Sequence, residues 1–197
     1  MIRAEYFMRE AKVSHSPGLI RNPSVSIILP AYCRGDSGLL KRAIESVLSQ
    51  TFQSFELIVM DDGSTDSTAQ IISSYVKADD RVIHVRHDGN CGLWALRVNE
   101  GLLMARGEFC AYQFDDDRWA EAALATLVGE LRRNPNFGIA YGLCKCTLDG
   151  KEIVLGGPFN YSHLVAGNFI ANNSVVHRRT VFERLGGGIN GISDAVH

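Results

Sequence analysis

Strand-like and helix-like segments alternate between residues 25 and 141, and this order limits the folds that are open to the chain. Short runs rich in apolar residues are typical of strands buried inside a parallel sheet. They occupy residues 25–29, 55–60, 81–85, 109–114 and 137–141. Apolar residues at helical spacing separate them, as Leu40, Ile44 and Val47 do after the first run. Because parallel strands need a crossover between them, the alternation predicts a doubly wound, mostly parallel α/β sheet.

The two ends of the chain follow other patterns. Residues 2–13 are expected to form a short amphipathic helix, and residues 14–23 a linker. Beyond residue 141, shorter strands joined by glycine-rich turns predict a small mixed β region. These strands are expected at residues 144–148, 152–155 and 169–177, followed by a helix at 178–185. Before residue 141, helices are expected at 93–105 and 119–133.

Composition excludes several classes of protein. A net charge of −2 gives no basic field of the kind that nucleic acid attracts, so no nucleic-acid partner is expected. No apolar run approaches the roughly 20 residues of a membrane span, and residues 1–9 lack a signal-peptide core. The five cysteines lack the paired spacing of a metal site, which favours free thiols. A reduced, cytoplasmic protein is therefore expected.

Three separated segments lie at the ends of strands of the predicted sheet: Pro30-Ala31-Tyr32, Asp61-Asp62-Gly63-Ser64 and the acidic triplet, Asp115-Asp116-Asp117. Ligands of doubly wound sheets bind beyond the carboxyl ends of the strands, so these segments are predicted to converge on one crevice. Adjacent carboxylates repel one another unless a cation lies among them, and their oxygens suit Mn²⁺ or Mg²⁺. The alternative is an acidic turn that caps the next helix.

The phosphate-binding motifs of common nucleotide folds are missing. The chain has no Gly-x-Gly-x-x-Gly after its first strand and no Gly-Lys-Ser/Thr loop. A phosphorylated ligand would therefore need another positive charge, which a divalent cation on the acidic triplet would supply. This suggests departure of a diphosphate, with the cation stabilising the charge on the leaving group.

Four segments carry a resemblance to a known family. They are Pro30-Ala31-Tyr32, Ser49-Gln50-Thr51-Phe52, the run from Phe55 to Asp66, and Gly107-Glu108-Phe109 leading to the acidic triplet. Together they resemble the family 2 glycosyltransferases, inverting enzymes of the GT-A fold, over residues 24–194. The resemblance implies transfer of a hexose or amino-hexose from a nucleotide-diphosphate sugar, with UDP as the expected carrier. The implied acceptor is a saccharide or other hydroxyl compound, and the implied process is polysaccharide biosynthesis.

The resemblance assigns nucleoside contacts to the ends of the first two strands. Pro30 and Tyr32 match the loop that lies along the nucleoside. Asp62 matches the carboxylate that accepts a hydrogen bond from the base, the alternative being a plain turn former. Asp61 is expected to be structural and to fix the turn by accepting from backbone N–H groups.

For the acidic triplet, the resemblance aligns Trp119 with the family's aromatic position and so makes Asp116 the metal ligand. Asp115 then falls where a ribose or metal contact is made, and Asp117 is the neighbouring alternative ligand. Phe114 takes the place of the first aspartate in many members, so the register stays open by one residue. The expected cofactor is Mn²⁺ or Mg²⁺.

Inversion needs a carboxylate that takes the acceptor's proton on the face opposite the leaving diphosphate. The resemblance places this base after the turn at 186–190, which makes Asp194 the candidate; the alternative is a surface residue near a chain end. The family continues with acceptor-binding elements, so a truncated chain is expected. The expected division is an N-terminal extension (1–23), a nucleotide-sugar-binding half (24–142) and a partial acceptor-side half (143–197).

Four further positions have competing interpretations. Arg97 stands one residue early relative to the family's arginine, so it either touches the ligand or is a solvated helix charge. His163 and His177 are expected to be satisfied structural groups rather than ligands. The segment Asn172-Asn173-Ser174 either binds sugar hydroxyls or forms an ordinary polar turn.

Two functions remain open on this reasoning. The first is metal-dependent, inverting sugar transfer. The second is a nucleotide-sugar-binding fragment or pseudoenzyme without turnover, because the acceptor half is incomplete. A receiver-like phosphate-transferring domain is disfavoured, since such domains carry an acidic pair after the first strand, where this chain has Pro30-Ala31-Tyr32.

Overall fold

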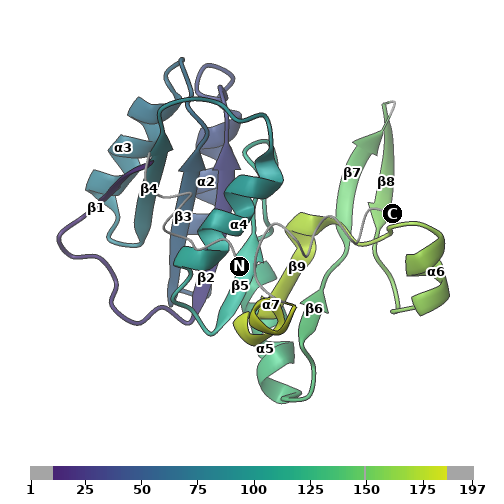
Figure 1. Cartoon of the computed structure of the whole chain (residues 1–197). Helices are drawn as coiled ribbons and strands as arrows, with labels where there is room; N and C mark the ends of the chain where they lie inside the picture. The colour runs from purple at the N-terminus through teal and green to yellow at the C-terminus, as the bar shows by residue number, and fades with distance from the viewer. Residues whose placement is uncertain (1–10, 149, 186–197) are drawn as a thin grey trace.

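The computed structural model describes residues 11–148 and 150–185 (Figure 1). Its strands are β1 (Ala11–His15), β2 (Val25–Ala31), β3 (Phe55–Asp61), β4 (Val82–His87), β5 (Phe109–Tyr112), β6 (Ile139–Tyr141), β7 (Cys144–Leu148), β8 (Lys151–Leu155) and β9 (Val175–Arg178). Its helices are α2 (Leu39–Leu48), α3 (Thr68–Ala78), α4 (Trp94–Met104), α5 (Ala123–Arg133), α6 (Tyr161–Ala166) and α7 (Arg179–Arg184), with the 3-10 turn η1 at Asn172–Ser174.

Within these residues, one sheet has the order β1-β4-β3-β2-β5-β9-β6, and β7 and β8 form a separate hairpin. Strands β4, β3, β2 and β5 run parallel, while β1 and β9 pair antiparallel with β4 and β5. The predicted mostly parallel α/β class is confirmed. Pro30 lies inside β2, and the pairing of β2 with β5 ends at Ile28. The missing N–H of Pro30 therefore faces a side where the ladder has already ended, so β2 continues to Ala31.

Helices cover both faces of the sheet and give three layers (Figure 1). Helices α2, α3 and α5 pack with one face, and α4 packs with the other. Val25, Ile27 and Leu29 of β2 belong to the first apolar cluster and Ile28 to the second, as alternation along a strand requires. All four side chains are fully buried, so β2 is the centre of the molecule.

The N-terminal segment differs from the prediction. Residues 11–13 lie in β1, which pairs with β4, so the helix expected over 2–13 is wrong for its described part. Lys12 also forms an ion pair with Asp88, with Nζ 3.3 Å from Oδ1. Backbone pairing at the sheet edge outweighs the helical pattern here, and the extension contributes a strand.

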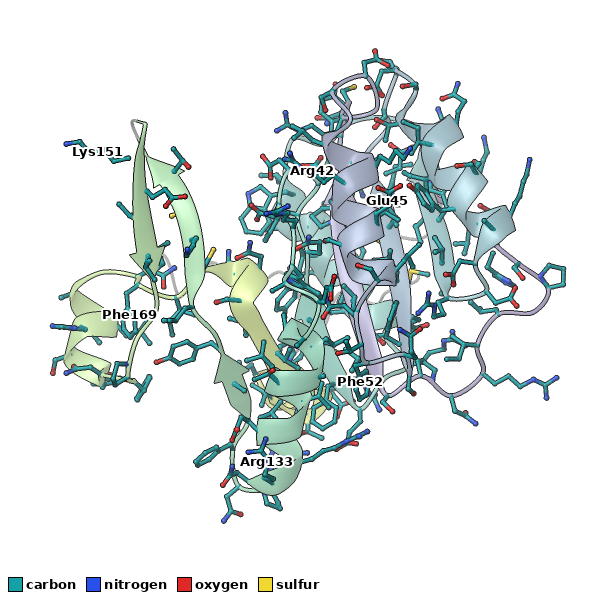
Figure 2. The ribbon with its side chains drawn as sticks, turned by 180° about the vertical axis from the view of Figure 1, so that it is seen from behind. Arg42, Glu45, Phe52, Arg133, Lys151 and Phe169 are labelled. Atoms are coloured by element: carbon teal, nitrogen blue, oxygen red, sulfur yellow. The ribbon has the colours of Figure 1, made fainter. Side chains whose placement is uncertain are left out.

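The C-terminal part follows the prediction in outline. The helices expected at 93–105 and 178–185 are confirmed as α4 and α7, whereas the helix expected at 119–133 begins only at Ala123. The strand expected at 169–177 is shortened to β9 because η1 precedes it, and α6 was not predicted. The β7–β8 hairpin and α6 stand clear of the main sheet (Figure 1), and Lys151 and Phe169 mark this region in Figure 2.

Candidate functional site

The carboxyl ends of β2, β3 and β5 are neighbours, because β2 lies between the other two strands. The Tyr32 N–H donates to Asp115 Oδ2 at 3.1 Å, which joins the segment after β2 to the acidic triplet. The Asp62 N–H donates to the carbonyl of Ala31 at 3.0 Å, which joins β3 to β2. The three segments thus meet at the carboxyl ends of these strands, as predicted.

Asp61 and Gly63 shape the turn between β3 and α3. The buried Asp61 carboxylate accepts from the Ser64 N–H at 2.9 Å, which confirms its predicted structural role. Burial alone would raise the pKa of Asp61, but hydrogen bonds from His84 and Ser64 outweigh it and lower the pKa. Gly63 has φ +70°, and a Cβ there would lie 2.4 Å from the Gly89 carbonyl carbon. The turn therefore needs glycine to pack against the β4–α4 loop.

Asp62 is held by a buried ion-pair network. Its Oδ1 accepts from Arg97 Nε at 2.6 Å, and both of its oxygens lie 3.2 Å from the Cys91 N–H. Arg97 Nη1 donates to both oxygens of Glu100, at 3.0 and 2.9 Å. His87 Nε2 lies 3.0 Å from Glu100 Oε2 but without the alignment of a hydrogen bond. Arg97 is 6% exposed, so its interpretation as a solvated helix charge is wrong.

Burial disfavours the charged form of Arg97, yet its pKa is raised because Glu100 and Asp62 both bond to the guanidinium. The arginine therefore stays charged and fixes the orientation of Asp62. The base-reading role of Asp62 remains a prediction; the carboxylate has about four acceptor positions and so keeps capacity for one more donor.

Asp115 and Asp116 face one arginine that had no predicted role. Arg34 Nε lies 3.5 Å from Asp115 Oδ1, and Arg34 Nη2 lies 3.5 Å from Asp116 Oδ2. Burial raises the pKa of Asp115, and the like charge of Asp116 adds to that, while the Tyr32 N–H and Arg34 oppose it. The position between these two carboxylates is therefore suited to a positive charge.

Asp117 turns toward η1 instead. Asn173 Nδ2 donates to Asp117 Oδ2 at 2.7 Å, and the Asn173 carbonyl accepts from Trp119 Nε1 at 2.6 Å. Burial and the neighbouring Asp116 raise the pKa of Asp117. The residue Asn173 thus lies at the site with its amide committed to Asp117, and a contact with sugar hydroxyls remains a prediction.

Asp115 and Asp116 both lie 3.5 Å from Arg34, whereas Asp117 accepts from Asn173, and the cation site on Asp116 and Asp117 stays a prediction. In the described part of the chain, no three His, Cys, Asp or Glu side chains converge on a common point. Mg²⁺ is commonly bound by one or two carboxylates together with substrate phosphates, so two carboxylates suffice when a diphosphate supplies further oxygens.

Two buried glutamines position the loop that carries the triplet. Gln50 Nε2 donates to the Ala120 carbonyl at 2.8 Å, and Gln50 Oε1 accepts from the Leu124 N–H at 2.9 Å. Gln113 Nε2 donates to the Asp117 carbonyl at 3.1 Å. Both are fully buried. Sequence reasoning assigned neither a role, although an amide inside the apolar run 109–114 was a signal of such bonding.

The two histidines lie in different settings. The Arg178 carbonyl can only accept, so His177 Nδ1, at 2.8 Å, carries the proton, and Nε2 accepts from the Tyr112 hydroxyl at 2.5 Å. His177 is 6% exposed, so its predicted structural role is confirmed. His163 is exposed on α6, where its ring lies edge-on to Phe169.

The stability of the protein is expected to fall as the pH decreases below about 6.5. Burial lowers the pKa of His177 from 6.5, although its bond to the Arg178 carbonyl opposes the shift. Below pH 6.5 the unfolded chain takes up this proton before the folded chain does, so protons favour unfolding. Urea midpoints at about pH 7.5 and about pH 5.5 should differ less for His177→Gln than for the wild type. Equal differences would contradict the expectation.

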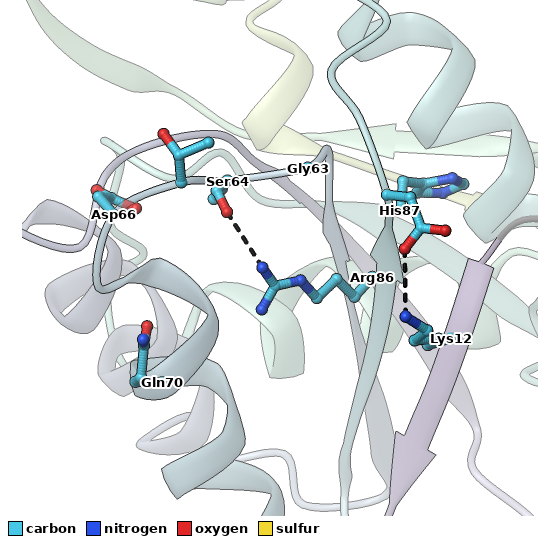
Figure 3. A pocket seen from close by; sticks show the side chains of 9 residues that line it. Lys12, Gly63, Ser64, Asp66, Gln70, Arg86 and His87 are labelled. Atoms are coloured by element: carbon cyan, nitrogen blue, oxygen red, sulfur yellow. Dashed lines mark hydrogen bonds and ion pairs between the residues drawn. The ribbon is translucent and has the colours of Figure 1, made fainter.

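A polar cavity of about 520 Å³ lies near the ends of β3 and β4 (Figure 3). Ser64, Asp66, Gln70 and Arg86 line it, and Arg86 Nη2 donates to the Ser64 carbonyl at 3.3 Å. None of the acidic triplet lines this cavity. Arg86 Nε also lies 3.9 Å from Asp61 Oδ2, so the arginine supports the β3–α3 turn.

The predicted base and its glycine turn lie beyond the described residues. Asp194 and residues 186–190 belong to that part of the chain, so the role of Asp194 stays a prediction. No helix in the described ranges is both long and apolar enough to cross a membrane.

A mostly parallel sheet covered by helices on both faces, with polar side chains gathered at its strand ends, defines an α/β domain of the GT-A type. The family model for glycosyl transferase family 2 matches residues 26–181, and the chain belongs to this family. Glycosyltransferase GlyG of Streptococcus pneumoniae is 30% identical over 145 residues, which is 74% of this chain and 42% of GlyG. The chain thus spans less than half the length of that relative.

Solved structures share the fold at low sequence identity. Staphylococcus aureus TarS, residues 1–349 in complex with UDP-GlcNAc, has a TM-score of 0.67 and 20% identity, covering 83% of this chain and 47% of that one. The Pyrobaculum calidifontis mannosyltransferase PcManGT, in complex with GDP-Man and Mn²⁺, has a TM-score of 0.64 and 21% identity, covering 93% and 52%. These likenesses establish the GT-A fold.

Proposed function

We propose that this chain is the donor-binding part of an inverting glycosyltransferase that moves a sugar from a UDP-sugar to a hydroxyl acceptor. The observation that carries the proposal is the meeting of Tyr32, Asp62 and the acidic triplet at one edge of the sheet. Membership of family 2 supports it, as does the UDP-GlcNAc bound by TarS. The domain halves 24–142 and 143–197, polysaccharide biosynthesis and a cytoplasmic location belong to the same proposal.

In this proposal each residue of the site binds a different part of the donor. Pro30 and Tyr32 flank the nucleoside, and Asp62, oriented by Arg97, accepts from the base. Asp116, with Asp115 beside it and Asp117 as the alternative, holds Mn²⁺ or Mg²⁺. A bound divalent cation would stabilise the negative charge that develops on the leaving diphosphate.

The remaining step is removal of a proton from the acceptor hydroxyl. Asp194 is the proposed base, since inversion needs a carboxylate on the face opposite the leaving group. The bond from the anomeric carbon to the acceptor oxygen forms as the bond to the diphosphate oxygen breaks.

The replacement Asp116→Ala tests the proposal. Binding of UDP-GlcNAc in saturating Mn²⁺, measured by calorimetry, is expected to weaken by about 100-fold, which corresponds to about 2.8 kcal/mol. Asp88→Ala is the matched control, because Asp88 is an exposed carboxylate after β4 that pairs with Lys12, and its affinity should not change. Unchanged affinity in Asp116→Ala would contradict the proposed cation site.

The second candidate is a nucleotide-sugar-binding module without turnover. It would hold the donor with the same residues, Tyr32, Asp62 and the acidic triplet, without activating an acceptor. Calorimetry with UDP and Mn²⁺, beside an assay of UDP-sugar hydrolysis and transfer, separates the two. Binding without turnover favours the module, and turnover favours the enzyme.

A further inference from the structure

The side chain of Arg34 bridges the carboxylates of Asp115 and Asp116, beyond the carboxyl ends of β2 and β5. Its Nε and Nη2 lie 3.5 Å from Asp115 Oδ1 and Asp116 Oδ2, and 43% of the side chain is exposed. A divalent cation held by Asp115 and Asp116 would need the place that this guanidinium takes. The proposed function gives Arg34 no task, although it carries the positive charge nearest to that place among the charged pairs described.

The contacts of the Arg34 guanidinium with Asp115 and Asp116 are weak. Charge-assisted hydrogen bonds have donor–acceptor distances of about 2.7–2.9 Å, and the 3.5 Å contacts of Arg34 are longer. The side chains of Arg34 and Asp116 are 43% and 51% exposed, and ion pairs between exposed side chains contribute about 0–1 kcal/mol; Asp115, 15% exposed, is the more buried partner. The buried Arg97, 2.6 Å from Asp62, shows the contrasting case of an arginine held firmly. The Arg34 guanidinium can therefore change partners at little cost.

The backbone under Arg34 is fixed. The Arg34 N–H donates to Thr68 Oγ1 at 3.0 Å, and the Gly35 N–H donates to Asp66 Oδ2 at 3.0 Å. Cys33 has φ +50°, an uncommon value outside glycine that neighbouring contacts must maintain. A flexible side chain on a fixed backbone lets the guanidinium turn while the loop stays in place.

We propose that Arg34 is a diphosphate-binding residue that exchanges its carboxylate partners for the donor. In the crevice without donor, its guanidinium neutralises Asp115 and Asp116. When a divalent cation binds these carboxylates, like charge displaces the guanidinium, whose planar fork then binds the diphosphate oxygens. This inference rests on the proposed function. Arg34 therefore weakens binding of the cation alone and strengthens binding of the diphosphate when the cation is present.

The variant Arg34→Met tests this exchange, because methionine keeps an unbranched side chain without the charge. The affinity for Mn²⁺ alone and the affinity for UDP in Mn²⁺ should change in opposite directions. Mn²⁺ alone, titrated by electron paramagnetic resonance of the free ion, should bind about 5-fold tighter or more, because the competitor is gone. UDP in saturating Mn²⁺, titrated by calorimetry, should bind about 10-fold weaker or more, because a charged contact with the diphosphate is lost. Arg34→Lys should recover part of the UDP affinity, since a point charge still attracts phosphate.

Arg42→Met is the matched control, because Arg42 is an exposed arginine on α2 (Figure 2), and both affinities should stay at the wild-type values. Two affinities that fall together, or two that do not change, would overturn the role of Arg34 while leaving the cation site intact. A wild type whose affinity for UDP is the same with and without Mn²⁺ would overturn the proposed cation site and, with it, this inference.

Discussion

Replacement of Arg97 by leucine is expected to lower the free energy of unfolding by about 3–5 kcal/mol, the usual cost of removing one partner of a buried ion pair. The guanidinium bonds to Asp62 and to Glu100, which are 5% and 1% exposed. Without it, two carboxylates stay buried with less compensation, and water does not replace the lost bonds. Urea unfolding should show a lower midpoint with an unchanged m-value.

Arg133→Leu is the matched control for this change, because Arg133 lies on the surface of α5 (Figure 2) and its ion pair with Glu130 is largely exposed. Its effect should stay within about 1 kcal/mol. The double variant Arg97→Leu with Glu100→Leu should lose less stability than the sum of the single changes. It also removes the Glu100 carboxylate, which Arg97→Leu alone leaves buried without its partner. A loss below about 1 kcal/mol in Arg97→Leu would contradict the buried-network explanation.

The same network marks the limit of prediction from the sequence. Arg97 stands in a helix whose apolar spacing was clear, and the helix was correctly predicted. Its partner Asp62 was not, because Asp62 lies 35 positions away in the chain and the pairing depends on how α4 is rotated against β3. A pattern of 3.6 residues gives the buried face of a helix but not the group that a long polar side chain meets.

The central strands were predictable because each is buried on both faces and therefore continuously apolar. The edge strand β1 was missed, since four of its five residues are exposed and leave no apolar alternation that would mark a strand. Placement of the acidic triplet followed from topology alone, because parallel strands end at a common edge. The sequence could not predict the different partners within the triplet. In the folded chain, Asp115 and Asp116 face Arg34, whereas Asp117 faces Asn173.

Removal of the Glu56 carboxylate is expected to cost about 3 kcal/mol of stability, at the lower end for buried ion pairs because Arg106 keeps some contact with water. Glu56 is fully buried near the start of β3. It accepts from Ser26 Oγ at 2.6 Å and from the Arg106 N–H at 2.9 Å, and its other oxygen accepts from Arg106 Nε at 2.8 Å. Glu56→Ala would leave these donors to compete for water at the end of the sheet opposite the crevice.

The position of Glu56 separates stability from ligand binding. The variant should show a lower urea midpoint, while the fraction that remains folded binds UDP in Mn²⁺ as the wild type does, because Glu56 and Asp61 lie near opposite ends of β3. Glu108→Ala is the control, since Glu108 is exposed and pairs with Arg178 at 2.9 Å, and it should cost about 1 kcal/mol or less. Equal losses in the two variants would mean that burial of the Glu56 carboxylate adds nothing to its contribution. A loss of UDP affinity in folded Glu56→Ala would mean that the two ends of the sheet are energetically coupled.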